Sequence, residues 1–328
     1  MNKELLKKLC AVNGVSGHEG PVIDVIRDEI KDLVDSCTVD AMGNLIAHKK
    51  GAGKKMMLAG HMDQIGLMIT FISDEGFLHF GTIGGMSPTI CYGTRFVFPN
   101  GTIGVCYTER LDDPKAITFD KMYLDIGAKD KEDAEKYVKI GDVCTFAAEP
   151  TVNGGAFISP AIDDRMGCFI MIEALKKLKN PAYDLYFVFT SQEEVGLRGA
   201  KTAAFAIEPD YGLSFDVTIS ADTPKSRKFP SKMYGGAAIK LKDASLLCHP
   251  TMINHLEKCA KDANIKYQFE ILEAGGTDSG AIHVNKGGVP SGVISIASRY
   301  IHSPNEMCAL SDVEDCINLT VKALETAI

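Results

Sequence analysis

The middle of the chain restricts the possible folds more than any other feature of the sequence. Residues 67–157 hold short strand-like runs separated by glycines, with one helix-like stretch at Lys131–Val138. Outside this region, strand-like and helix-like segments alternate, as in an α/β sheet. We therefore expect an α/β fold, in which residues 1–66 and 158–328 form a mixed-sheet domain with helices on both faces. Residues 67–157 would form a small inserted β-barrel-like domain, with a sandwich as the alternative.

Hydrophobic spacing identifies the elements expected in the α/β domain. Helical periodicity covers residues 3–12, 20–34, 166–178, 197–205 and 251–263, and a last helix follows near the C-terminus. Strand-like runs cover residues 36–40, 44–48, 55–59, 184–190, 211–215, 267–272 and 292–296. Ser311 and Glu314 have the spacing of a capping box, so we expect the last helix to begin after Ser311.

Composition and charge exclude several classes of protein. The 328 residues are 45% hydrophobic, which is enough for a sizeable core and argues against disorder. Thirty-five basic and 43 acidic residues give a net charge of -8, so a nucleic-acid partner is not expected. The apolar run Ile65–Ile72 is far shorter than the roughly 18 residues of a membrane span, and no membrane partner is expected. Charges repeat along Met1–Lys8, unlike a signal peptide, so we expect a cytoplasmic protein.

The ten cysteines are scattered singly, without a Cys-x-x-Cys pair. Paired spacing is typical of thiolate metal sites and redox motifs. We therefore expect reduced cysteines that are buried as small apolar residues.

Polar side chains gather where the strands of the α/β domain should end, which is where open α/β sheets bind ligands. Each group has an ordinary explanation when it is taken alone. A single histidine is usually structural, and adjacent aspartates can cap a helix. Together, two histidines and several carboxylates are the ligand types of a two-zinc or two-cobalt hydrolase. The groups are His61 with Asp63, Asp163 with Asp164, Glu193 with Glu194, Asp216, and His302.

Seven short segments, in chain order, closely resemble the tetrahedral aminopeptidases, also called the glutamyl aminopeptidase family. Members of this family are often labelled endoglucanases or cellulase M. The resemblance extends over nearly the whole chain, and the combination of segments is far more specific than any one of them. The segments are Val15-Ser16-Gly17, Asp40-Ala41-Met42-Gly43-Asn44-Leu45, Gly60-His61-Met62-Asp63, Asp163-Asp164-Arg165, Gln192-Glu193-Glu194-Val195-Gly196, Gly275-Gly276-Thr277-Asp278 and Arg299-Tyr300-Ile301-His302-Ser303.

The resemblance implies a role for each metal ligand. His61 and Asp216 would hold one divalent ion, Glu194 and His302 would hold the other, and Asp163 would bridge them. The ligand types suit zinc or cobalt, and the sequence does not decide between these metals.

The remaining site residues would act around these ions. Glu193 would be the general base, and Asp63 would orient His61. Asp164 would lie in the unusual peptide linkage that related enzymes place after the bridging aspartate. Gly276 and Thr277 would contact the substrate backbone.

The activity implied by the resemblance is removal of the N-terminal residue from peptides with free N-termini. A water molecule that bridges two metal ions would attack the peptide bond, with a glutamate as general base. The resemblance also implies that the inserted domain mediates dimer contacts, and that dimers assemble into a hollow tetrahedral dodecamer.

Three other functions remain open from the sequence. A related deacylase would use the same metals on acylated amino acids or sugars, and a panel of acylated substrates would reveal it. A glycoside hydrolase would need two carboxylates and no metal, so a chelator would not inhibit it. A non-catalytic assembly protein would bind peptides without cleaving them.

Two departures from the family pattern leave the preferred N-terminal residue open. Gln64 stands where a glutamate is common, and His18 stands where an aromatic residue is common. Neither change removes an expected ligand, but a lost carboxylate near the site alters the field that a charged substrate meets.

Overall fold

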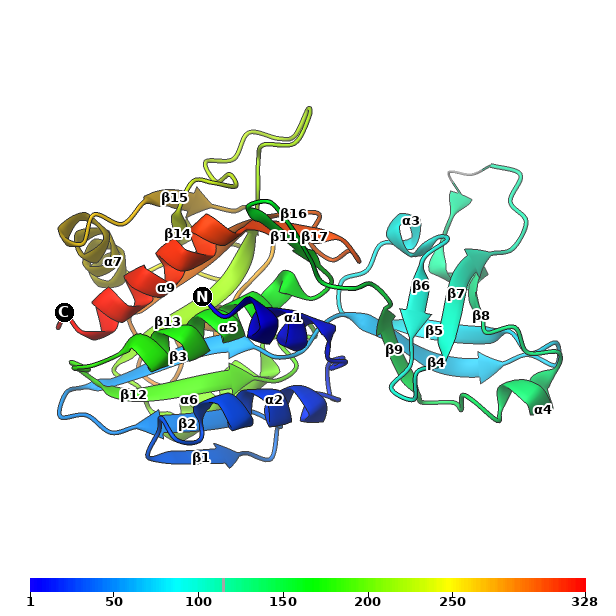
Figure 1. The fold of residues 1–328 in the computed structure, drawn as a ribbon, viewed down its shortest axis with the longest axis horizontal. Coiled ribbons are helices and arrows are strands. Elements are labelled where there is room, and N and C mark those ends of the chain that lie inside the picture. Colours follow the sequence, from blue (N-terminus) through cyan, green and yellow to red (C-terminus); the bar gives the residue numbers. More distant parts are fainter. Residues whose placement is uncertain (114–115) are drawn as a thin grey trace.

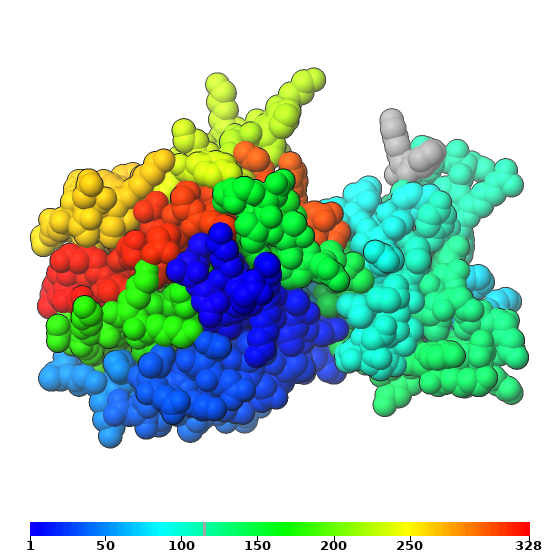
Figure 2. Space-filling model, in the orientation of Figure 1, coloured from blue at the N-terminus to red at the C-terminus, as the bar shows by residue number. Residues whose placement is uncertain are grey.

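The computed structural model describes residues 1–113 and 116–328. Figure 1 shows a large part, in which helices cover a sheet, and a smaller part made mainly of strands. The large part contains an 11-stranded mixed sheet, and the smaller part is a closed barrel. In the space-filling view the barrel stands beside the larger part as a separate lobe (Figure 2). The expected mixed-sheet α/β fold with a barrel-like insertion is confirmed, and the sandwich alternative is excluded.

Four parallel strands form the centre of the large sheet. They are β3 (Lys55–His61), β12 (Asp184–Thr190), β13 (Tyr211–Ile219) and β16 (Ser291–Arg299). Their residues are buried almost continuously, because helices cover both faces of a parallel sheet. The carboxyl ends of these strands meet at one edge, where the chain changes from apolar to polar residues.

The outer strands extend the sheet on both sides. On the β12 side the order continues through β2 (Leu45–Lys49) to β1 (Ser36–Val39). On the β16 side it continues through β17 (Glu306–Ala309), β11 (Ala156–Ser159) and β10 (Thr151–Asn153). A branch adds β14 (Ala237–Lys242) beside β16, and β15 (Tyr267–Ile271) pairs with β14.

The helices divide between the two faces of the sheet. The main core lies under α1 (Lys3–Ala11), α2 (Gly20–Ile30), α5 (Ile162–Lys177), α7 (Pro250–Asp262) and α9 (Leu310–Leu324). A second core lies under α6 (Arg198–Ile207) and α8 (Asp278–Ile282) on the opposite face. Among the described residues, no helix is long and apolar enough to cross a bilayer.

The barrel has a hydrophobic core of its own, which includes Phe96 and Leu124. Outside residues 114–115, the barrel region carries three short helical segments: α3 (Pro88–Cys91), η2 (Phe119–Lys121) and α4 (Lys131–Ala134). Its strands, in order around the barrel, are β4 (Gly66–Ile72), β5 (Leu78–Ile83), β8 (Met122–Asp125), β7 (Ile103–Thr108), β6 (Arg95–Val97) and β9 (Val143–Phe146).

All ten cysteines are free, and nine of them are buried. The expectation of reduced, buried cysteines is confirmed. Cys37, on the outer strand β1, is the partly exposed exception.

The expected capping box at the start of the last helix is wrong. Helix α9 begins at Leu310, directly after β17, and its N-cap residue Ala309 has no capping side chain. Ser311 therefore lies within the first turn. Glu314 does not reach back to the helix start, because its carboxylate pairs with Lys177 at 2.6 Å. Pairing of β17 with its neighbouring strands thus fixes where the helix begins.

Periodicity also missed several elements of the large part. The strands β10, β11, β14 and β17 and the helix α8 were not expected, and β13 continues to Ile219, beyond the expected end at residue 215. Asp216 consequently lies within a strand instead of closing it. Strands β17 and β14 carry the charged residues Glu306 and Lys240 at buried positions, so their sequences do not read as apolar runs.

Candidate metal centre

The parallel strands bring the expected ligands to one place. His61 is the last residue of β3 and is paired in register with Thr190, the last residue of β12. Glu193 and Glu194 follow β12 immediately, while Asp216 lies in β13 on the other side of β3. Residues that are far apart in the sequence therefore meet at the carboxyl edge of the sheet.

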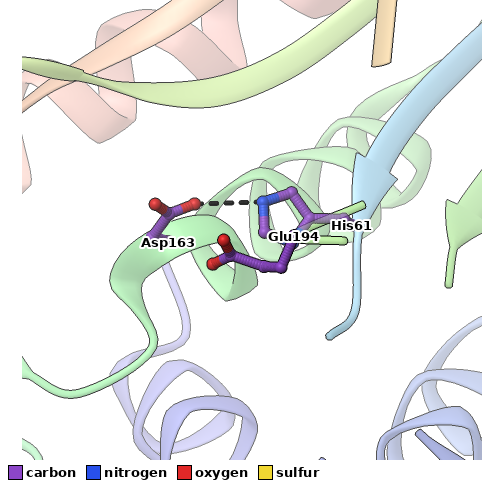
Figure 3. A group of neighbouring side chains, drawn as sticks. All are labelled: His61, Asp163 and Glu194. Atoms are coloured by element: carbon purple, nitrogen blue, oxygen red, sulfur yellow. Dashed lines mark hydrogen bonds and ion pairs between the residues drawn. The ribbon is translucent and has the colours of Figure 1, made fainter. Parts of the chain in front are cut away.

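Asp163 lies between the two histidines. Its Oδ1 is 3.0 Å from Nε2 of His61, and its Oδ2 is 3.2 Å from Nε2 of His302. Nε2 of His302 is also 3.3 Å from Oε2 of Glu194. Figure 3 shows the carboxylates of Asp163 and Glu194 beside the imidazole of His61. A carboxylate that presents one oxygen to each histidine has the arrangement of a bridging ligand.

Two groups of ligand atoms share His61. One group is His61, Asp163 and Glu194, and the other is His61, Glu193 and Asp216. Within each group the ligand atoms all lie within 4.8 Å of one another. Oε2 of Glu193 is 3.9 Å from Nε2 of His61. The five expected ligands and the expected base thus form one cluster. His61, Asp163 and Asp216 are buried, whereas Glu193, Glu194 and His302 are partly exposed.

Burial and mutual repulsion perturb the carboxyl groups of this cluster. Burial raises the pKa of Asp216 well above its usual range, and the charges of Asp163, Asp164 and Glu193 raise it further. The pKa of Glu193 is also raised well above its usual range, chiefly by burial. Carboxyl groups this close cannot all ionise without a nearby positive charge.

The pKa values of the two histidines are also raised, because the nearby carboxylates stabilise the charged imidazolium. Burial lowers the pKa of His61, but the carboxylates of Glu193, Asp163 and Asp63 outweigh it, and the net shift is upward. For His302 the carboxylates of Asp163 and Glu194 likewise overcome burial and raise the pKa to about 12. The cluster thus binds positive charge strongly.

The cluster fits a divalent cation. Oε1 of Glu194 is buried without a hydrogen-bond partner, which leaves an oxygen available for coordination. Among the described residues, no lysine or arginine lines the cavity that contains the cluster, so the two histidines are the cationic side chains there that can face its carboxylates. Imidazole nitrogens together with carboxylate oxygens are ligands that zinc and cobalt accept.

Asp63 supports the cluster through both its main chain and its side chain. Its carbonyl oxygen is 3.0 Å from Nδ1 of His61, so it accepts the proton on that nitrogen and leaves Nε2 facing the cluster. The carboxylate of Asp63 accepts the main-chain N–H groups of Glu193 and Glu194, at 2.9 and 3.2 Å. Its Oδ1 is also 3.5 Å from Nδ1 of His61.

Glu306 is a site residue that the sequence analysis missed. Its side chain is buried in β17, where one oxygen accepts the N–H of Asp163 and the other accepts the N–H of His302, both at 2.9 Å. The sequence signal that could have identified Glu306 is the presence of a glutamate in the otherwise apolar segment Glu306–Ala309. Its carboxylate fixes the main chain of two expected ligands.

The remaining expected residues take different positions. The peptide bond between Asp163 and Asp164 is cis, the unusual linkage that the family resemblance implied. Gly276 lines the cavity, which has a volume of about 590 Å³. Thr277 is buried instead, and its hydroxyl donates to Asp243 at 3.3 Å. The structure therefore brings Gly276, but not Thr277, to the cavity wall.

The fold is a mixed α/β fold, and the cluster at its sheet edge is a candidate metal site. Residues 43–319 match the family of M42 glutamyl aminopeptidases, and the chain belongs to this family. Membership supports aminopeptidase activity, which is hydrolysis of a peptide bond.

Related proteins match over nearly their whole length. A putative aminopeptidase from Acetivibrio thermocellus is 52% identical, with 98% of each chain covered. The lysyl aminopeptidase of Pyrococcus furiosus is 35% identical, over 98% of this chain and 96% of the relative.

Solved structures show the same fold. The aminopeptidase APDkam598 from Desulfurococcus kamchatkensis is 38% identical and has a TM-score of 0.96, covering 99% of this chain and 94% of that one. The TET1 peptidase of Pyrococcus horikoshii, which can assemble into a tetrahedron or a large octahedral shell, is 32% identical. Its TM-score is 0.88, and 99% of each chain is covered.

Removing the carboxylate between the histidines should weaken metal binding. We expect Asp163→Ala to lower the affinity for zinc by roughly 10- to 100-fold or more, since a loss of that size follows even when a partner of a ligand is removed. Titration with zinc and elemental analysis after dialysis would measure the change. Asp262→Ala, at an exposed position in α7, is the control. Wild-type metal content in Asp163→Ala would contradict this assignment.

Proposed function

We propose that this protein removes the N-terminal residue of peptides with the help of two divalent metal ions, zinc or cobalt. The observation that carries the proposal is the position of Asp163, with one carboxylate oxygen toward His61 and the other toward His302. In this proposal His61 and Asp216 would hold one ion, Glu194 and His302 would hold the other, and Asp163 would serve both. Two cations held there would act as Lewis acids, which acidify a water molecule and polarise the scissile carbonyl group.

Glu193 is the proposed general base. Its side chain is only 10% exposed, faces the cluster, and lies next to His61 without serving in the proposed ligand set. Burial raises its pKa well above the usual range, which makes its carboxylate a stronger proton acceptor. Glu193 would take a proton from water and deliver it to the nitrogen of the departing amine.

The cavity wall favours substrates with an apolar N-terminal side chain. Outside the cluster, the described residues that line the cavity carry aliphatic or small uncharged side chains, among them Leu197, Val217, Ile219, Leu272 and Ile301. An aliphatic side chain would bury apolar surface there, whereas a charged one would lose its hydration without gaining a partner. The carboxylates of the cluster would attract the free ammonium group of the substrate.

A chelator experiment with a substrate panel tests the proposed function. After metal removal, we expect activity on aminoacyl chromogenic substrates to disappear and to return with zinc or cobalt. Leucyl substrates should exceed glutamyl and lysyl substrates by about tenfold or more in kcat/KM, and N-acetylated peptides should not react.

Other outcomes of this panel would contradict the proposal. Turnover of acylated substrates alone would indicate a deacylase, and full activity in the presence of chelator would exclude a metal mechanism. Preference for a glutamyl or lysyl substrate would contradict the apolar specificity while leaving the aminopeptidase activity in place.

The role of Glu193 can be separated from metal binding. Glu193→Gln keeps the shape of the side chain but removes the proton acceptor. We expect kcat to fall by roughly 10²- to 10⁴-fold while the metal content remains that of the wild type. Steady-state kinetics and elemental analysis would measure both quantities. Wild-type turnover in this variant would show that another group is the base.

We also propose that the inserted region, residues 67–157, mediates dimer contacts through its barrel, and that six such dimers assemble into a dodecamer. Alternate residues of β7, namely Ile103, Val105 and Tyr107, are each about two-fifths exposed and face outward from the barrel. Tyr92 adds to this apolar surface, because its hydroxyl donates to that of Tyr107 at 2.7 Å. A row of exposed apolar residues of this kind is typical of a protein interface.

Charges on this surface should prevent assembly. We expect the double variant Ile103→Glu, Val105→Glu to shift the protein to a smaller species in analytical ultracentrifugation. Ile271→Glu is a matched control, because Ile271 is equally exposed at 42% but lies on β15 of the large sheet. An unchanged assembly in the double variant would place the dimer interface elsewhere.

A further inference from the structure

The metal cluster does not explain the segment Val15-Ser16-Gly17 or the buried glutamate that follows it. This segment runs beside the residues after His61. Val15 forms a parallel bridge with Gln64, and the N–H of Ser16 donates to the carbonyl of Gln64 at 3.3 Å. The N-terminal segment thus lies directly against the loop that carries Asp63.

Glu19 binds a main-chain group on a distant segment. It is only 5% exposed and stands at the N-cap of α2, but its side chain does not cap that helix. Oε1 of Glu19 instead accepts the N–H of Gly17 at 2.8 Å and the N–H of Gln192 at 3.1 Å. A buried carboxylate therefore connects the start of the chain to the residue before Glu193.

Asp63 and Ser16 extend this connection. The two carboxylate oxygens of Asp63 accept the N–H groups of Glu193 and Glu194, and Oγ of Ser16 donates to Asp63 at 2.6 Å. Three consecutive amides, from Gln192 to Glu194, thus each donate to a buried carboxylate. We call Ser16, Glu19 and Asp63 the amide clamp.

The segment held by the amide clamp is one that would not keep its shape unaided. Gln192 has a φ of 54°, a left-handed conformation that costs free energy for a residue with a side chain. A carboxylate oxygen of Glu193 also lies within 4.8 Å of one of Asp216, and like charges at this distance repel each other. Without external hydrogen bonds, the segment could relax and turn Glu193 away from the cluster.

We propose that Glu19 is a positioning residue for Glu193. By holding the amide of Gln192, it fixes the left-handed turn and keeps the carboxylate of Glu193 directed at the cluster, 3.9 Å from His61. Glu19 does not contact the cavity itself. The proposal rests on the proposed function for the role of Glu193, but the geometry of the clamp does not depend on that function.

Substitution of Glu19 tests the proposal. In Glu19→Ala we expect kcat to fall by roughly 10- to 100-fold, with KM changed by less than about threefold, because a small displacement of a reacting group has such effects. Zinc content should equal that of the wild type. Glu19→Gln retains an oxygen that accepts the same two N–H groups, so its kcat should stay within about threefold of the wild type.

Hydrogen exchange gives a readout that is independent of activity. In Glu19→Ala we expect the amides of residues 192–194 to exchange at least about tenfold faster, since they lose a hydrogen-bond acceptor and the turn loosens. Asp28→Ala, an exposed residue on the same helix as Glu19, is the matched control and should change neither kcat nor exchange. If Glu19→Ala does not fold, Glu19→Asp, which shortens the side chain by one methylene, replaces it with the same expectations.

Three outcomes would overturn the proposal. Wild-type kcat and exchange in Glu19→Ala would show that the clamp is not needed. An equal loss in Glu19→Gln and Glu19→Ala would show that the charge matters rather than the accepted hydrogen bonds. Loss of zinc together with kcat would make Glu19 a support of the metal ligands instead. If the wild type cleaves no peptide, the proposed function fails, and the exchange rates still decide whether the clamp exists.

Discussion

The guanidinium group of Arg165 is fully buried and donates to four main-chain carbonyl oxygens. Three belong to the N-terminal segment, namely Leu9, Val12 and Gly14, and the fourth is Met62, directly after His61. Burial lowers the pKa of Arg165, while the nearby charges of Asp63 and Glu19 oppose that effect. One positive charge thus joins the start of α5, the end of β3 and the first helix. The amide clamp and the metal cluster both depend on this junction.

A common device fixes the loops that carry the site. Ligands that follow the ends of parallel strands lie close to one another. The loops that hold them, however, have main-chain N–H groups without partners in the sheet. Buried carboxylates accept these groups: Asp63 and Glu19 at residues 192–194, and Glu306 at Asp163 and His302. The acidic character of the region therefore serves two purposes, since some carboxylates face the cluster and others hold its backbone.

The sequence was sufficient to predict the fold class and the gathering of the expected ligands. The apolar strands that lead into His61 and Glu193 indicate the α/β fold. They also indicate where the ligands gather, because parallel strands bring their carboxyl ends together. The sequence did not predict the roles of Glu306 and Glu19 or the start of α9, and the reason is the same for all three. Each is determined by a contact with a segment more than one hundred residues away, which for α9 is the pairing of β17 with β11. Local periodicity cannot show such a contact.

One contact joins the barrel region to the cluster. The carbonyl oxygen of Gly85, between β5 and α3, lies 2.6 Å from Nδ1 of His302. Because a carbonyl can only accept, Nδ1 carries the proton and Nε2 is left toward Asp163 and Glu194. A shortened chain that lacked the barrel, from β4 to β9, would retain every expected ligand, yet the imidazole of His302 would be free to rotate and to change its tautomer. The barrel is therefore not a detachable accessory, and a minimal version of this enzyme would have to supply a substitute for one peptide carbonyl.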